Sequence, residues 1–239
     1  MGVLSFPDRR DIDAVVFDAG GVLLLPDAEA GRAAIATLDC QSTPEDWRRA
    51  HYATLPLLDQ MQPIDWPAHR RAIAVEIGVP DDCLDAAAAL IEDVMATTAW
   101  VAVPGAADAL RALSGAGYQL AVVSNAWGTV AQWLEQHGVC SVAGGDLPQV
   151  ATVVDSHLVG VEKPDPRIFQ LAIDALGVPA ARSLYVGDTI KFDVNGAYRA
   201  GLHPVHVDPY DFCDGTHRHV ADLAELTGWL VDGEPPRAA

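Results

Sequence analysis

Apolar residues follow two different periods along the chain, and the change of period predicts two kinds of structure. The apolar run 14–17 contains two β-branched valines and is followed by Gly20 and Gly21, a pattern typical of a strand buried on both faces. After it, apolar positions recur at three- and four-residue spacing, which predicts helices at 28–38, 45–58, 68–77 and 84–97. The sequence therefore predicts a first strand followed by a helical insertion.

The starts of these inserted helices carry capping signals. Ser42 and Glu45 have the spacing of a capping box ahead of the second helix. Pro67 suits the first position of the third helix, and Asp81 or Asp82 can cap the fourth. These signals favour a helical bundle inserted after the first strand.

Beyond residue 100, strand-like and helix-like segments alternate. Such alternation indicates βαβ units around a parallel sheet. We therefore predict an α/β fold, with a Rossmann-like parallel sheet core and helices on both faces, built from 1–25 and 102–239, and an inserted α-helical cap domain at 26–101. The expected strands are 119–124, 150–154, 183–186 and 205–207, and the expected helices are 106–113, 129–137, 167–176, 194–200 and 220–230.

Composition restricts the classes of partner. A net charge of −18 argues against binding to nucleic acid, and it requires a local positive centre in any site for a small anion. No apolar segment is as long as a membrane span and no cationic leader precedes one, so we expect a soluble, cytoplasmic protein. The four cysteines form no Cys-x-x-Cys pair, which argues against a disulfide framework or a zinc cage. The oligomeric state is left open.

Polar residues stand where three of the predicted strands end. They are Asp18, the pair Ser124-Asn125, and Asp188 after Gly187. Because ligands of open parallel sheets bind outside the carboxyl ends of the strands, we expect these side chains to share one pocket. Asp18 and Asp188 could there hold a hard divalent cation such as Mg²⁺ through carboxylate oxygens.

The order and spacing of these segments, over nearly the whole chain, resemble the haloacid dehalogenase-like hydrolase superfamily. The resemblance is carried by Phe17-Asp18-Ala19-Gly20-Gly21-Val22-Leu23, Val123-Ser124-Asn125, Lys163-Pro164-Asp165-Pro166 and Val186-Gly187-Asp188, with Asp193 five residues after Asp188. The helical insertion matches the mobile cap domain of that family. The resemblance implies a phosphatase that acts on a small phosphorylated metabolite.

The resemblance also assigns roles around the metal. Asp18 would be the nucleophile that forms an aspartyl phosphate, and it would bind Mg²⁺ together with the carbonyl of Gly20 and the carboxylate of Asp188. Asp193 would support the metal site, although it could instead cap the helix that begins at Val194.

Substrate binding is assigned by the same resemblance. Ser124 would bind the phosphoryl oxygens with the backbone amide of Asn125, and Gly20 and Gly21 would line the same loop. Lys163 would offset negative charge between the nucleophile and the phosphoryl group. An ordinary surface lysine is the alternative, but the chain has only one other lysine, Lys191, which favours the functional role.

Gly20 departs from the family pattern. Phosphatases of this family usually carry a second aspartate here, which protonates the leaving group and later activates water. General acid–base catalysis contributes about 10²–10⁴ in rate, so we expect activated esters to be better substrates than simple alkyl phosphates. Seven histidines could replace the missing acid, and none is assigned that role: His51, His69, His157, His203, His206, His217 and His219.

Two alternatives remain from the sequence. The first is a 2-haloacid dehalogenase, which Asp188 argues against because a second carboxylate would repel a haloacid. The second is a binding or regulatory protein that keeps the fold and the metal site without turnover. Only Gly20 supports it.

Overall fold

A computed structural model describes residues 7–96 and 100–234 of the chain. The chain forms two compact units. One comprises Met1–Leu23 and Ala102–Ala239, and the other comprises Leu24–Val101. We refer to them as the core unit and the helical unit.

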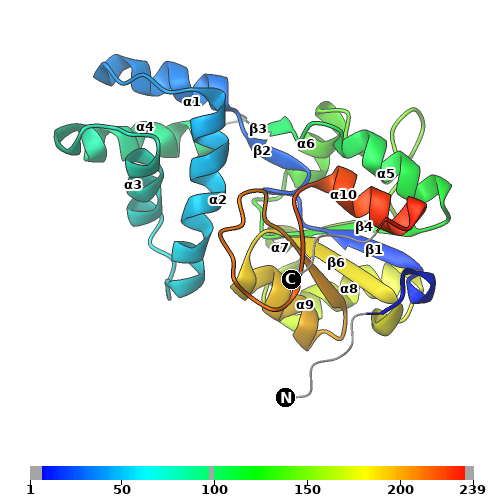
Figure 1. Ribbon diagram of the computed structural model, residues 1–239. Helices are drawn as coiled ribbons and strands as arrows, with labels where there is room; N and C mark the ends of the chain where they lie inside the picture. The colour runs from blue at the N-terminus through cyan, green and yellow to red at the C-terminus, as the bar shows by residue number, and fades with distance from the viewer. Residues whose placement is uncertain (1–6, 97–99, 235–239) are drawn as a thin grey trace. The chain divides into compact units, whose positions relative to one another are not determined.

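The core unit contains a six-stranded sheet in the order β5-β4-β1-β6-β7-β8 (Figure 1). Every neighbouring pair of these strands is parallel. All residues of β1 are buried, as expected for a central strand that is covered on both faces. The strands are β1 (Ala14–Phe17), β4 (Gln119–Ser124), β5 (Val153–Asp155), β6 (Ser183–Gly187), β7 (His203–Val207) and β8 (Arg218–Val220).

Helices cover both faces of this sheet, and the predicted fold class is confirmed. Figure 1 shows α5 and α10 on one side of the sheet and α8 and α9 on the other. Alternate strand residues, such as Ala14, Val16 and Tyr185, pack with Ile168 and Phe169 of α8 in one buried cluster. The helices are α5 (Ala106–Gly115), α6 (Val130–Gln136), α7 (Ser156–Val159), α8 (Pro166–Leu176), α9 (Asn195–Arg199) and α10 (Leu223–Thr227).

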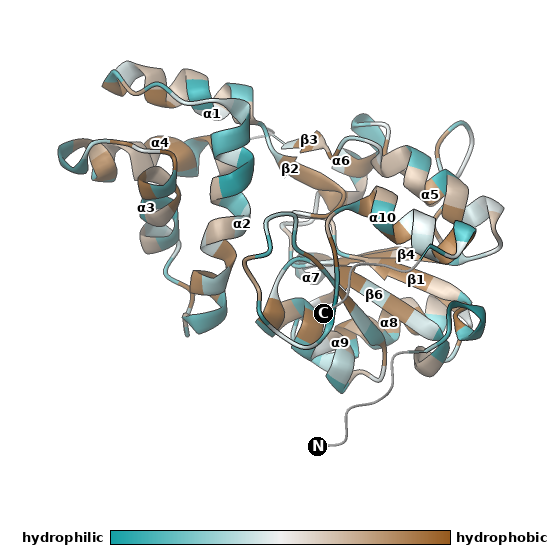
Figure 2. Cartoon of the chain, in the orientation of Figure 1, coloured by the Kyte–Doolittle hydropathy of each residue, from teal (hydrophilic) through white to brown (hydrophobic). Residues whose placement is uncertain are grey.

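The helical unit has an apolar core of its own, in which Trp47, Ile73 and Ile91 are buried. Hydrophobic and hydrophilic residues are interspersed along its helices (Figure 2). No described helix is both long enough and apolar enough to cross a membrane. The elements are β2 (Leu24–Pro26), α1 (Ala28–Ile35), α2 (Pro44–Gln60), α3 (Trp66–Glu76), α4 (Leu84–Ala96) and β3 (Trp100–Ala102), where β2 pairs with β3.

Three of the predicted helix starts are wrong in detail. Asp65 caps α3, which begins at Trp66, so Pro67 is its second residue and not its first. The capping box before α2 is formed by Thr43 and Asp46, one residue later than predicted, and each satisfies the other's backbone amide. Asp81 and Asp82 do not cap α4. They form a separate turn of 3₁₀ helix, Asp81–Cys83, in front of it.

The final helix begins later than predicted because Val220 ends strand β8. Asp222 caps the helix, its side chain accepting the amide of Glu225, so α10 starts at Leu223. The strand expected at 150–154 occupies Val153–Asp155. The short strands β2, β3 and β8 were not predicted, because three residues carry too little periodicity to be recognised.

Candidate active site

The carboxyl ends of β1, β4 and β6 bring the predicted polar residues to one edge of the sheet. Phe17 of β1 is in register with Val122 of β4 and Val186 of β6, so the next residues of these strands lie side by side. Asp18 donates its amide to the carbonyl of Val186, 2.8 Å away, which extends the pairing by one residue. Asp18, Ser124 and Asp188 are all buried there.

Three carboxylates converge at this edge. One oxygen of each of Asp18, Asp188 and Asp193 lies within 4.8 Å of the other two. Such a set of hard oxygen donors suits a divalent cation such as Mg²⁺. The Asp18 carboxylate is held by the neighbouring amide of Ala19, which donates to its Oδ1 at 2.6 Å.

Lys163 is buried among these carboxylates and is only 2% exposed. Its Nζ lies 2.9 Å from Oδ2 of Asp18 and 2.7 Å from Oδ1 of Asp193. The backbone of Lys163 is held by Asn125, whose side chain accepts from its amide at 2.8 Å and donates to its carbonyl at 3.0 Å. The surface alternative for this lysine is therefore excluded.

Asp193 is positioned by both of its carboxylate oxygens. Oδ2 accepts from the amide and the hydroxyl of Thr189, at 2.9 and 2.5 Å. Oδ1 accepts from Lys163 and lies 3.1 Å from the hydroxyl of Tyr185. A Cβ on Gly187 would lie 2.3 Å from the Cβ of Asp193, so only glycine at the end of β6 lets this carboxylate approach.

Burial and the charges of neighbours set the protonation of the site. Burial, reinforced by the carboxylates of Asp193 and Asp188, raises the pKa of Asp18 to about 7 despite the nearby ammonium of Lys163. Burial opposes the charge of Lys163, but the carboxylates of Asp18 and Asp193 outweigh it and raise the lysine pKa to about 12. Burial likewise opposes ionisation of Asp193, yet Lys163 and Thr189 hold its pKa below the usual value.

The raised pKa of Asp18 reflects its burial together with an excess of carboxylate groups over cations in the site. Three carboxylate groups surround one ammonium, and a divalent cation would balance their negative charge when they are ionised.

Tyr185 and Thr189 belong to this network and were missed by the sequence reasoning. The Tyr185 hydroxyl accepts from Lys163 Nζ at 3.0 Å and lies 3.0 Å from the carbonyl of Val123. The only signal in the sequence was a hydroxyl-bearing residue inside an apolar strand and another directly after Asp188. The side chain of Asn125 also has a role that was not predicted, since it holds the Lys163 backbone rather than acting through its amide alone.

The other predicted residues lie on the same loops. Ser124 ends β4, and Gly20 and Gly21 follow Asp18. Gly21 has a φ of 71°, a left-handed conformation that favours glycine. Of the histidines, His69 is buried in the helical unit, whereas His206, His217 and His219 gather in a separate cluster of the core unit.

A parallel sheet with carboxylates at the ends of its strands places the chain among α/β proteins whose ligand site lies at the carboxyl edge of the sheet. Residues 12–201 match the haloacid dehalogenase-like hydrolase family, so the chain belongs to that family. The family resemblance seen in the sequence is confirmed.

Similar proteins include phosphatases and a dehalogenase. A protein of Dickeya dadantii named "Probable phosphatase IndB" is 32% identical over 199 residues, covering 81% of this chain and 80% of that protein. A glyceraldehyde 3-phosphate phosphatase of Methanopyrus kandleri is 39% identical over 74 residues, which cover 31% of this chain and only 32% of that enzyme. A crystal structure described as a dehalogenase covers 92% of this chain and 97% of its own, with 26% identity and a TM-score of 0.55.

Proposed function

We propose that the protein is a Mg²⁺-dependent phosphatase of small phosphorylated metabolites that works through an aspartyl phosphate on Asp18. The observation that carries the proposal is the buried group of Asp18, Asp188 and Asp193 around the single ammonium of Lys163. This arrangement combines a nucleophile, a fixed cation and oxygen ligands for a divalent metal. In this proposal the unit Leu24–Val101 serves as the cap domain.

The first step transfers the phosphoryl group to the enzyme. A carboxylate oxygen of Asp18 attacks phosphorus, the bond from phosphorus to the leaving-group oxygen breaks, and the leaving group departs with that electron pair. Lys163 lies 2.9 Å from the Asp18 carboxylate and stabilises the charge that spreads over the transferring oxygens. The hydroxyl of Ser124 and the amide of Asn125 bind the same oxygens without adding charge.

The second step releases phosphate. Water attacks phosphorus, the bond between phosphorus and the Asp18 oxygen breaks, and the free carboxylate and inorganic phosphate are formed. In this proposal Asp18, Asp188 and the carbonyl of Gly20 hold Mg²⁺, which when bound neutralises the phosphoryl charge and orients the group for attack. Both oxygens of Asp193 accept hydrogen bonds from protein groups, which supports a positioning role beside the metal.

The lack of an acidic side chain at Gly20 determines which phosphate esters should be hydrolysed fastest. It supplies no proton to the leaving group, so acyl, aryl and anomeric sugar phosphates should be hydrolysed faster than alkyl phosphates. The variant Gly20→Asp should accelerate the alkyl esters and leave the activated ones little changed.

The test is a screen of phosphate release with the full chain, with Mg²⁺ and with a chelator. Acetyl phosphate, p-nitrophenyl phosphate, glucose 1-phosphate and glycerol 3-phosphate sample decreasing leaving-group acidity. Asp18→Asn should abolish release, and Asp174→Asn, an equal change of charge on an exposed part of α8, should not. Turnover by Asp18→Asn, or turnover that persists without a metal, would contradict the proposal.

Two other outcomes separate the alternatives. Halide release from a 2-haloacid without Mg²⁺ would make the protein a dehalogenase, against which the buried Asp188 argues because it would repel the substrate carboxylate. Binding of Mg²⁺ and a phosphate mimic without turnover of any ester would make it a binding or regulatory protein.

A further inference from the structure

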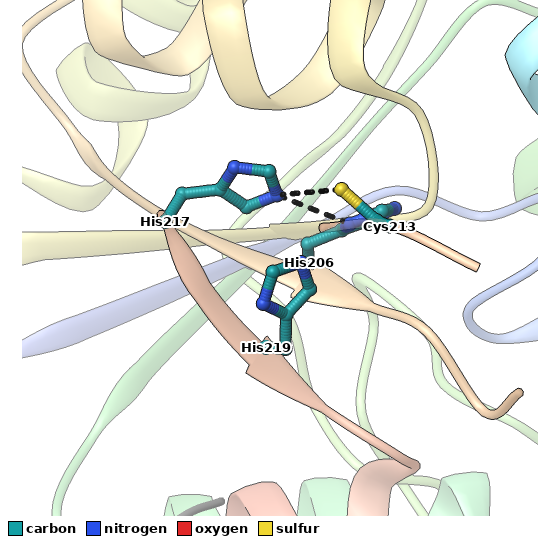
Figure 3. Close-up of side chains that lie close together, drawn as sticks. All are labelled: His206, Cys213, His217 and His219. Atoms are coloured by element: carbon teal, nitrogen blue, oxygen red, sulfur yellow. Dashed lines mark hydrogen bonds between the residues drawn. The ribbon is translucent and has the colours of Figure 1, made fainter. Parts of the chain in front are cut away.

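A second cluster of metal-binding side chains lies in the core unit, formed by His206, Cys213, His217 and His219 (Figure 3). His206 belongs to β7 and His219 to β8, where the two residues are paired in register. His217 lies directly before β8, and its Nε2 is 3.2 Å from Nδ1 of His206. Cys213 reaches the group from the connection between the two strands.

Two of the distances within the cluster are close to those around one tetrahedral ion. Each residue offers one ligand atom, and these four atoms lie within 4.8 Å of one another. His217 Nε2 is 3.2 Å from His206 Nδ1 and 3.8 Å from Cys213 Sγ. With metal bonds of about 2.05 Å to nitrogen and about 2.3 Å to sulfur, a tetrahedral site gives ~3.3 Å between two nitrogens and ~3.6 Å between nitrogen and sulfur.

The surrounding structure orients these side chains. His206 Nε2 lies 3.0 Å from the backbone carbonyl of Asp188 and donates to it, which fixes the tautomer that presents Nδ1 to the cluster. A ligating histidine whose other ring nitrogen donates to a carbonyl is the usual arrangement in metal sites. The Asp208 carboxylate accepts the amides of Phe212 and Cys213, at 3.0 and 2.8 Å, and so fixes the loop that carries the thiol.

Gly215 gives the loop its close approach to the histidine. Its amide lies 3.4 Å from the sulfur of Cys213, and a Cβ at this position would lie 2.6 Å from the ring carbon Cε1 of His217. Any larger residue would displace the ring.

We propose that His206, Cys213, His217 and His219 bind one Zn²⁺ ion at a site separate from the carboxylate cluster around Asp18. Three imidazoles and one thiolate are nitrogen and sulfur donors, which suit zinc and not Mg²⁺. Four protein ligands complete a tetrahedral shell, so the ion has a structural role: it ties the connection between β7 and β8 to the sheet.

The proposed zinc site also contacts Asp188, a proposed ligand of the catalytic Mg²⁺. His206 donates to the carbonyl of Asp188, the residue whose carboxylate joins the acidic group of the active site. Zinc bound to His206 therefore stabilises the backbone that positions Asp188.

The experiment measures zinc binding by the metal-stripped full chain. The chain should take up one equivalent of Zn²⁺, and Co²⁺ should give the intense visible bands of a tetrahedral ion together with a thiolate-to-cobalt band in the near ultraviolet. Cys213→Ser should abolish the thiolate band and weaken Zn²⁺ binding by about 100-fold or more. Cys83→Ser, which removes a thiol in the helical unit, is the matched control and should bind as the parent does.

Further variants separate this site from the active site. Asp188→Asn keeps the backbone carbonyl and should retain the cobalt spectrum, whereas Gly215→Ala should distort or lose it without removing a ligand. If Asp188→Asn abolishes binding while Cys213→Ser does not, the metal occupies the carboxylate site and the proposal is wrong. The absence of a thiolate-to-cobalt band from the wild-type chain would also overturn the proposal, whatever the variants show.

Discussion

Lowering the pH should destabilise the helical unit through His69, which is only 3% exposed. A guanidinium N–H of Arg70 donates to Nδ1 of His69 at 2.8 Å, so the proton of the neutral ring is on Nε2. That Nε2–H donates to the hydroxyl of Thr54 at 3.1 Å, and the hydroxyl donates to the carbonyl of Ala50 at 2.8 Å. A second proton on the ring would be bound at Nδ1, where it would point at the guanidinium N–H of Arg70 and remove the acceptor of that hydrogen bond.

The size of the effect follows from the pKa. Burial, together with the charge of Arg70, lowers the pKa of His69 from 6.5 to about 3. Between these two values the unfolded chain binds a proton that the folded chain does not, so stability is fully present above pH 6.5 and falls as the pH decreases. At about 1.4 kcal/mol per pH unit, going from pH 7 to pH 5 should cost about 2 kcal/mol.

The assay is urea unfolding at pH 7 and pH 5, followed by far-ultraviolet circular dichroism, for the parent and for His69→Gln. Glutamine keeps a neutral polar side chain at this position but cannot bind a proton between pH 7 and pH 5. The variant should be less stable than the parent at pH 7. Between pH 7 and pH 5, however, its free energy of unfolding should fall by about 2 kcal/mol less than that of the parent. Groups that titrate in both proteins contribute equally to the two changes, so the comparison isolates His69. An equal loss in the two proteins would refute the assignment of a neutral, buried His69.

Three further outcomes test the active site. Mg²⁺ at a hundred times its dissociation constant should stabilise the chain by about 2.7 kcal/mol in thermal unfolding, and Asp188→Asn should remove this gain. Gly187→Ala forces Asp193 away and should cost about 1–3 kcal/mol, whereas Gly115→Ala, in helix α5 where a Cβ has open space, should be neutral or stabilise the chain by up to about 1 kcal/mol. Lys163→Met should lose phosphate release and cost about 3–5 kcal/mol because it leaves buried carboxylates without their cation; an unchanged unfolding midpoint would argue against the ion pairs.

The sequence predicted the sheet well, because its strands are apolar runs bounded by glycines and polar residues. It placed Asp18, Ser124 and Asp188 at strand ends, since in a parallel sheet these ends share one edge. The short strand β8 could not be predicted, because its three residues contain histidine and arginine.

Contacts between residues far apart in the sequence could not be predicted from the sequence. The hydrogen bond from Lys163 Nζ to the hydroxyl of Tyr185 joins residues 22 positions apart, and no local sequence pattern predicts it. The sequence analysis argued against a zinc cage because the cysteines form no Cys-x-x-Cys pair, and it assigned no role to the histidines of this cluster. Only the pairing of β7 with β8 places His206 beside His219.

Acid-quenched turnover is the most direct test of the central claim that Asp18 accepts the phosphoryl group. The chain is mixed with Mg²⁺ and labelled acetyl phosphate, quenched over a series of times, digested and mapped by mass spectrometry. We predict one phosphoryl group on the peptide that contains Asp18, accumulating in the parent because Gly20 supplies no base for the second step, and absent from Asp18→Asn. Sustained phosphate release with no label on that peptide at any time would contradict the account.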